Sequence, residues 1–181
     1  FGRQEGGSLD ARQDSQRFTL QRSGEYLLLL EGNIANQAAL AYEFELQRVI
    51  DSISPLSIGD TMIANIDRPG KVAHFTFDLA DTTPVVFDRL SDADFSWTLN
   101  GPAGRHVARR LASPSILFDG AERLLLPPGS YTLSVDLDGA GTGSFPFRLL
   151  AADSAQELVT GAVTNGLLDR ATASQLYKIA L

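Results

Sequence analysis

Apolar and polar residues alternate along several short segments of the chain. In YTLSVD, residues 131–136, the side chains of Tyr131, Leu133 and Val135 fall on one side and the residues between them on the other. The same period of two occurs in three further segments, residues 40–46, 74–79 and 95–100. A half-buried antiparallel strand requires this period, so each segment predicts a strand with one face toward a core.

Turn-forming residues separate these segments, and helical patterns are weak. Clusters of glycine, proline, asparagine and aspartate occur as DRPG, NGPAG, PPGS and DGAGTG. Such clusters are typical of the turns between short strands. Only residues 33–41 and 153–160 hint at a helix. The pattern therefore predicts an all-β fold, an antiparallel β-sandwich, and disfavours an α/β enzyme fold.

The strand pattern repeats along the chain. Residues 59–79, GDTMIANIDRPGKVAHFTFDL, align without a gap with residues 161–181, GAVTNGLLDRATASQLYKIAL, 102 positions later. A third, shorter copy lies in residues 8–20. The hairpin-like stretches 23–49 and 127–151 also match, at an offset of 105 positions at their glycine and tyrosine. A repeat of this kind predicts sandwich units in tandem.

The repeat divides the chain into three predicted parts. Residues 1–51 form a partial or shortened repeat, residues 52–152 a complete repeat, and residues 153–181 a linker with the opening strands of a further repeat. The short first copy is either a natural short repeat or one that lacks a mobile insert after Leu20. The first residues, FGRQEGGS, predict an excised fragment or a mature segment, and any targeting signal is expected to lie elsewhere.

One segment, YLLLLEG at residues 26–32, is apolar on both of its predicted faces. A strand of this kind is normally covered on both faces. One interpretation is a central strand beneath a loop or helix of the same chain. The other is a contact between adjacent units or between chains.

Composition excludes several classes of function. The net charge of −7 repels phosphate backbones, so nucleic acid is not a predicted partner. No apolar run approaches the roughly 20 residues of a membrane helix, which argues against membrane insertion. The absence of cysteine excludes disulfides, thiolate catalysis and cysteine-based metal sites.

Acidic residues offer the one candidate cofactor site, which is for calcium. Asp136 and Asp138 in DLDGAG place two carboxylates in a predicted turn, and calcium prefers clustered oxygens. The twelfth position from Asp136 is Phe147, where an EF-hand needs a bidentate glutamate. Asp92 and Asp94 form a second pair. The alternative is that these residues serve plain turns, which favour aspartate and glycine. No other cofactor is predicted.

Catalytic residues are not predicted, and we expect the chain not to be an enzyme. His74 and His106 lack a partner at metal-ligand spacing and are expected to be ordinary surface residues. A nucleophile elbow, G-x-S-x-G, does not occur in the sequence. Trp97 alternates with Phe95 and Leu99, which favours a core position over a sugar-stacking platform.

The order of the motifs resembles the pre-peptidase C-terminal type of domain and its tandem relatives in large secreted, adhesin-like bacterial proteins. The resemblance rests on GDTMIANIDRPGKVAHFTFDL, FSWTLNGPAGRHV and LLPPGSYTLSVDLDGAGTGSFPFRLL, and covers residues 52–152 in full. It implies a jelly-roll-like sandwich, a non-catalytic role and an extracellular location. Some relatives bind calcium through acidic loops.

These observations predict an extracellular structural or adhesive repeat module of a large bacterial secreted or cell-surface protein. Neighbouring repeats or identical chains are its expected partners, and strand addition would assemble it into a rod or filament. The alternative is an accessory module of a secreted enzyme that binds carbohydrate or calcium, with a glycan as partner.

Overall fold

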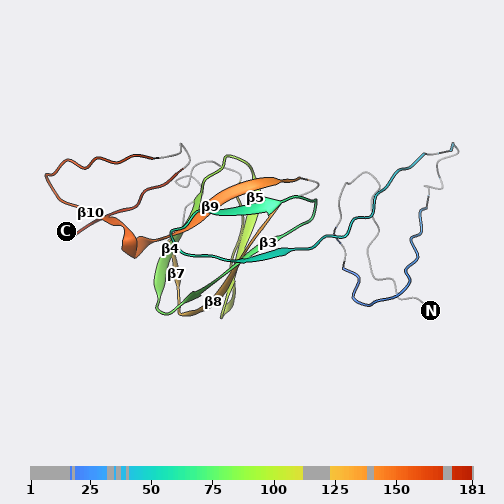
Figure 1. Ribbon diagram of the computed structural model, residues 1–181, viewed down its shortest axis with the longest axis horizontal. Helices are drawn as coiled ribbons and strands as arrows, with labels where there is room; N and C mark the ends of the chain where they lie inside the picture. The colour runs from blue at the N-terminus through green and yellow to red at the C-terminus, as the bar shows by residue number, and fades with distance from the viewer. Residues whose placement is uncertain are drawn as a thin grey trace.

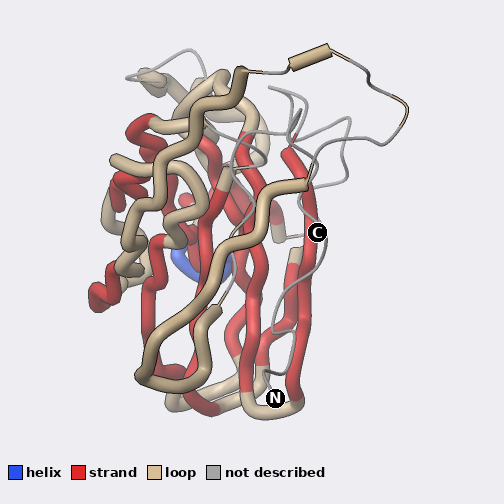
Figure 2. Tube along the Cα trace, turned by 90° about the vertical axis from the view of Figure 1, so that its right-hand side faces the viewer, coloured by secondary structure: helices blue, strands red, loops and turns tan. Residues whose placement is uncertain are grey.

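Two β-sheets of the chain pack face to face, and extended segments lie on either side of them (Figure 1). The computed structural model describes residues 17, 19–31, 35, 38–39, 41–111, 123–137, 141–168 and 173–180, with the backbone alone for residues 108–111. Turned by 90°, the strands run side by side along a common direction (Figure 2). In the part of the chain so described, no helix is long and apolar enough to cross a membrane.

The larger sheet has five strands in the order β1-β3-β8-β5-β6. Their bounds are β1 Ser52–Pro55, β3 Ala73–Leu79, β5 Phe95–Gly101, β6 Gly104–Leu111 and β8 Gly129–Asp136. Neighbouring strands run antiparallel, except that β1 runs parallel to β3. A tight turn connects β5 to β6, and Gly104 adopts a φ of 97° there, a conformation that side chains disfavour.

The smaller sheet has four antiparallel strands in the order β2-β9-β4-β7. Their bounds are β2 Met62–Ile66, β4 Thr83–Arg89, β7 Leu124–Leu126 and β9 Gly143–Ala151. Outside the two sheets, a 3-10 helix, η1 (Ala152–Ser154), leads to β10 (Gln156–Leu158), which pairs in parallel with β11 (Tyr177–Ile179).

Aromatic and aliphatic side chains from both sheets form one core. Phe87 of β4 stacks on Trp97 of β5, with ring centroids 4.3 Å apart, and stacks on Phe147 of β9 at 5.3 Å. Stacked rings in contact add to the free energy that apolar burial supplies. The predicted antiparallel β-sandwich is therefore confirmed, and so is the core position of Trp97, which is 4% exposed.

The period of two correctly gave the inward faces of three strands. In β8, Tyr131, Leu133 and Val135 are buried while the intervening residues are half-buried. The same alternation is present in β3 and β5. The register of β3 with β8 places Phe77 opposite Tyr131, and these two rings stack at 5.2 Å.

Two expectations about secondary structure, a helix at residues 153–160 and a strand at residues 40–46, differ from the structure. Residues 153–160 do not form a helix beyond η1, because the backbone of residues 156–158 pairs with β11 instead. Residues 41–46 belong to no sheet, and Tyr42, Phe44 and Leu46 are more than half exposed. Alternation in that segment supplies an apolar face, but nothing in the described part of the chain covers it. The hint of helix at residues 33–41 falls largely outside the described residues.

Residues 26–31 of the segment YLLLLEG are exposed. Leu27 is 91% exposed and Leu29 is 70% exposed, while Tyr26, Leu28 and Leu30 are about half exposed. Cover by a loop or helix of the same chain is therefore wrong for its described residues 26–31. A contact between units or chains stays a prediction.

Candidate functional site

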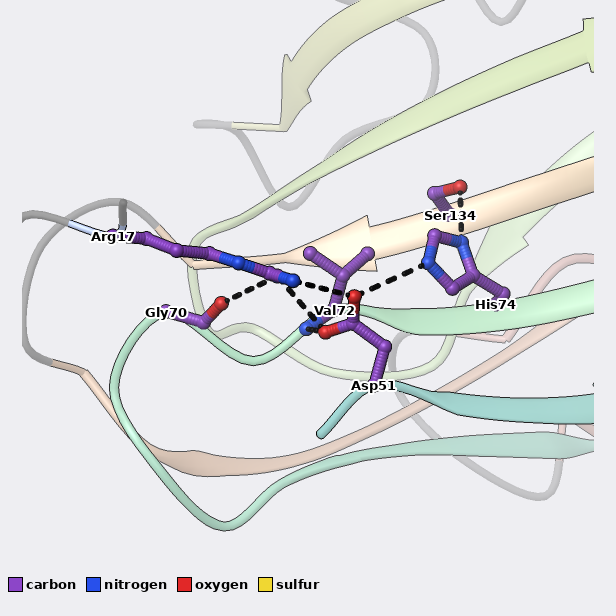
Figure 3. Close-up of polar contacts among 6 residues, drawn as sticks. All are labelled: Arg17, Asp51, Gly70, Val72, His74 and Ser134. Carbon is purple, nitrogen blue, oxygen red and sulfur yellow. Dashed lines mark hydrogen bonds and ion pairs between the residues drawn. The ribbon is translucent and has the colours of Figure 1, made fainter. Parts of the chain in front are cut away.

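A polar cluster lies where the N-terminal segment meets the sandwich (Figure 3). Asp51 directly precedes β1, and its carboxylate accepts hydrogen bonds from both terminal nitrogens of Arg17, at 2.9 and 2.8 Å. Arg17 Nη1 also donates to the carbonyl oxygen of Gly70, at 3.0 Å. The planar guanidinium suits this two-pronged contact with a carboxylate. Arg17 thereby ties the N-terminal segment to the start of β1 and to the turn before β3.

Asp51 also fixes the local backbone of the sandwich. The amide of Val72 donates to Asp51 Oδ1 at 2.9 Å, next to the parallel pairing of β1 with β3. The hydrogen bond from Arg17 is the main cause that lowers the pKa of Asp51, and partial burial opposes it. The same contact raises the pKa of Arg17. Both groups are therefore charged at neutral pH.

His74 of β3 and Ser134 of β8 extend the cluster across the sheet. His74 Nδ1 and Ser134 Oγ are hydrogen-bonded at 2.8 Å, with the donor set by the tautomer of the imidazole. His74 Nε2 lies 3.7 Å from Asp51 Oδ2. His74 and His106 are both half-buried, so part of each side chain remains at the surface.

Ser134, His74 and Asp51 lie next to one another in space, as in a catalytic triad, but their geometry fits a structural role. A catalytic triad needs the aspartate within hydrogen-bond distance of the imidazole and a serine that a substrate can reach. The 3.7 Å separation exceeds that distance, and Arg17 already holds the carboxylate. Ser134 sits in the middle of a strand between two sheet neighbours, β3 and β5. The cluster connects the N-terminal segment at Arg17 with the turn at Gly70 and with strands β3 and β8.

A second polar cluster attaches the C-terminal segment to the smaller sheet. Asp88 of β4 is fully buried and accepts a hydrogen bond from Arg148 Nε of β9 at 2.6 Å. Arg148 Nη2 donates to the carbonyl oxygen of Ser174 at 2.6 Å, and the amide of Ser174 donates to Asp88 at 3.3 Å. A buried polar group is costly unless it has hydrogen-bond partners, and Arg148 and Ser174 both donate to Asp88 Oδ2.

The described residues form two shallow clefts. One, of about 370 Å³, runs between Arg148 and the C-terminal segment and is lined by residues such as Leu168 and Leu176. The other, of about 340 Å³, lies on the outer side of β3, β5 and β8 near Asp78 and Ser130. The Asp51 cluster lines neither of them, whereas Arg148 and Ser174 of the second polar cluster line the first.

Of the predicted calcium pair, the structure describes Asp136 alone. Asp136 ends β8, is half-buried and lies opposite Ser96 in the sheet. Asp138 lies outside the described residues. Asp92 and Asp94 are exposed in the loop before β5. No group of three or more potential metal ligands gathers among the residues that the structure describes. Calcium binding at Asp136 and Asp138 stays a prediction.

Sequence reasoning missed both polar clusters. Arg17 and Asp51 are 34 positions apart, and Asp88 and Arg148 are 60 apart, so the chain offers no local signal for either pair. One signal was present. Alternation in β3 and β8 places His74 and Ser134 on polar faces, and two adjacent strands would bring these faces together.

Of the comparisons with known proteins, only the one with solved structures gives matches. No family model matches the chain, and no curated protein matches its sequence. Among solved structures, the chain is similar to the pre-peptidase C-terminal domain of collagenase from Bacillus anthracis, with 15% identity and a TM-score of 0.41. The similarity covers 58% of this chain and 99% of that domain. The all-β sandwich itself is shown by the strand order and the core of this chain.

Proposed function

We propose that the chain is a structural, adhesive repeat module of a large secreted or cell-surface bacterial protein, and that strand addition joins its units end to end. The observation that carries the proposal is a set of local structures that recur at the offsets of the sequence repeat. These structures lie both within the sandwich and in the segments outside it.

The turn before β2 recurs in the C-terminal segment. The amide of Asp60 donates to the carbonyl of Ser57, at 3.2 Å, and the amide of Ala162 donates to the carbonyl of Val159, at 3.1 Å. Gly59 and Gly161 accompany these turns, with φ of 96° and 82°. Each member of the second turn lies 102 positions after its counterpart, which supports the alignment of residues 59–79 with 161–181.

The parallel strand pair recurs at the same offset. In the sandwich, β1 pairs with β3 so that Ser54 lies opposite Phe75. In the C-terminal segment, β10 pairs in parallel with β11 so that Gln156 lies opposite Tyr177. Both partners are again displaced by 102 positions. The C-terminal segment thus has the opening arrangement of a sandwich unit, which supports a tandem architecture.

The start of β8 recurs in the N-terminal segment. Tyr131 donates its hydroxyl hydrogen to the carbonyl of Pro127 at 2.7 Å, and Tyr26 donates to the carbonyl of Arg22 at 2.6 Å. Both bonds span four residues, and the second set lies 105 positions before the first. Leu28 and Leu30, which are about half exposed, correspond to the buried Leu133 and Val135 of β8, as expected for a strand face that a partner covers.

Light scattering on the purified chain over a range of concentrations tests this function. We expect mass to increase with concentration for the complete chain and to stay at one chain for a variant that lacks residues 161–181, with near-ultraviolet circular dichroism as the check that the sandwich is retained. Unchanged assembly of that variant contradicts strand addition through this segment. A glycan array with and without calcium tests the accessory-module alternative, and specific binding there would replace the structural role.

A further inference from the structure

The antiparallel pair of β3 with β8 gives the template for a contact between copies. Phe75 lies opposite Leu133 and Phe77 lies opposite Tyr131 in this pair. Their side chains point into the core, and Leu133 and Tyr131 are at most 1% exposed. The pair is central to the larger sheet, because β8 connects β3 to β5.

Among the described residues, one edge of β11 has no partner strand, and this edge corresponds to the edge of β3 that pairs with β8. By the 102-position offset, Tyr177 corresponds to Phe75 and Ile179 to Phe77. Among the described residues, β11 is paired with β10 alone, on the side where β3 is paired with β1. Tyr177 is 37% exposed and Ile179 is 59% exposed. An exposed edge of this kind is a ready site for the addition of another strand.

Residues 24–30 carry the pattern of β8 without its partners. By the 105-position offset, Tyr26 corresponds to Tyr131, Leu28 to Leu133 and Leu30 to Val135. Leu28 and Leu30 are about half exposed, whereas their counterparts in β8 are fully buried. In the part of the chain that is described, this segment belongs to no sheet. Its backbone is thus available to pair.

The two segments do not meet within one molecule. Figure 1 shows residues 20–31 on one side of the sandwich, and β10 with the C-terminal end on the opposite side. A contact between them therefore joins two copies, head to tail. A head-to-tail contact that does not close on itself produces an open filament.

We propose that residues 24–30 of one copy add antiparallel to the free edge of β11 in a second copy, with Leu28 opposite Tyr177 and Tyr26 opposite Ile179. This inference rests on the proposed function and specifies its contact. The same register places Lys178 opposite Leu27 and diagonal to Glu25, so opposite charges are neighbours on the outer face. The proposed pair of strands has the same register as β3 with β8, and its apolar side chains lie on one face.

Paired cysteines test the register, and the chain offers a clean background because it has no cysteine. A Leu28→Cys chain is mixed with a Tyr177→Cys chain and oxidised, and disulfide-linked heterodimers are measured by mass spectrometry. Residues directly opposite in a ladder have the Cα separation that a disulfide needs. The matched control is Leu29→Cys mixed with Tyr177→Cys, since a shift of one residue reverses the face. We expect about tenfold more heterodimer with Leu28→Cys than with Leu29→Cys.

The outcomes separate this inference from the proposed function. Equal yields, or a higher yield with Leu29→Cys, overturn the register, and if light scattering still shows assembly, the structural role stands. A chain that stays monomeric at every concentration overturns both. A single chain with both Leu28→Cys and Tyr177→Cys is expected to give a ladder of covalent oligomers. A monomer with an internal disulfide would instead overturn the contact between copies.

Discussion

Asp51 connects three parts of the molecule through one carboxylate. It accepts from Arg17 in the N-terminal segment and from the amide of Val72 before β3, and it lies near His74. Its side chain is 24% exposed and that of Arg17 is 39% exposed, so solvent screens the pair in part. The residue therefore contributes modestly to stability and strongly to the position of the chain that enters β1.

The pH dependence of this contribution follows from the lowered pKa of Asp51. A folded-state pKa below the ordinary value of 3.8 means that the stabilisation is fully present above about pH 4 and is lost as pH falls through the folded-state pKa. We expect Asp51→Asn to lower the free energy of unfolding by about 1 kcal/mol or less at neutral pH. Urea unfolding from pH 7 to pH 2 measures this, and the difference should shrink toward the acid end.

The control for that substitution is Asp94→Asn, which changes an exposed aspartate in the loop before β5. Its effect on the free energy of unfolding should stay within about 0.5 kcal/mol. A difference between the Asp51→Asn chain and the unsubstituted chain that persists unchanged to pH 2 would show that the carboxylate charge is not what stabilises this junction.

At the scale of elements, the sandwich depends on the ring stack between its sheets. Phe87 of β4 contacts Trp97 and Phe147 and is 8% exposed. Truncation of a buried phenylalanine removes its burial energy and leaves a cavity. We expect Phe87→Ala to lower the free energy of unfolding by about 3–5 kcal/mol in urea titrations.

Phe44→Ala is the matched control for the ring stack. Phe44 is 56% exposed and lies outside the sandwich, so the same substitution there should cost less than about 0.5 kcal/mol in dilute solution. Comparable losses from the two variants would mean that residues 41–46 pack into the folded unit, contrary to the structure.

Alternation predicted the strands that are buried on one face and did not identify those buried on both. β3, β5 and β8 follow from the period of two, because one face meets the core and the other meets solvent. β4 is buried almost throughout and carries no alternation. The parallel pairing of β1 with β3 and the Asp51 and Asp88 clusters depend on residues far apart in sequence. Local pattern contains no signal for the pairs Arg17–Asp51 and Asp88–Arg148, although it places His74 and Ser134 on polar faces.

At the scale of the whole molecule, a sandwich stands between two segments that repeat parts of it. The C-terminal segment repeats the turn before β2 and the pairing of β1 with β3, and the N-terminal segment repeats the corner at the start of β8. Each exposes apolar side chains that are buried at the corresponding positions of the sandwich. In the proposed assembly, burial of these side chains between copies would supply the free energy.

Amide hydrogen exchange of the complete chain, measured in dilute and in concentrated solution, tests this account most directly. Strand addition places the amides of residues 26–30 and 177–179 in hydrogen bonds between copies, so the account predicts that both segments become protected together as concentration rises, while the amides of β3, β5 and β8 are protected throughout. Free exchange in both segments in a concentrated, assembled sample would contradict it.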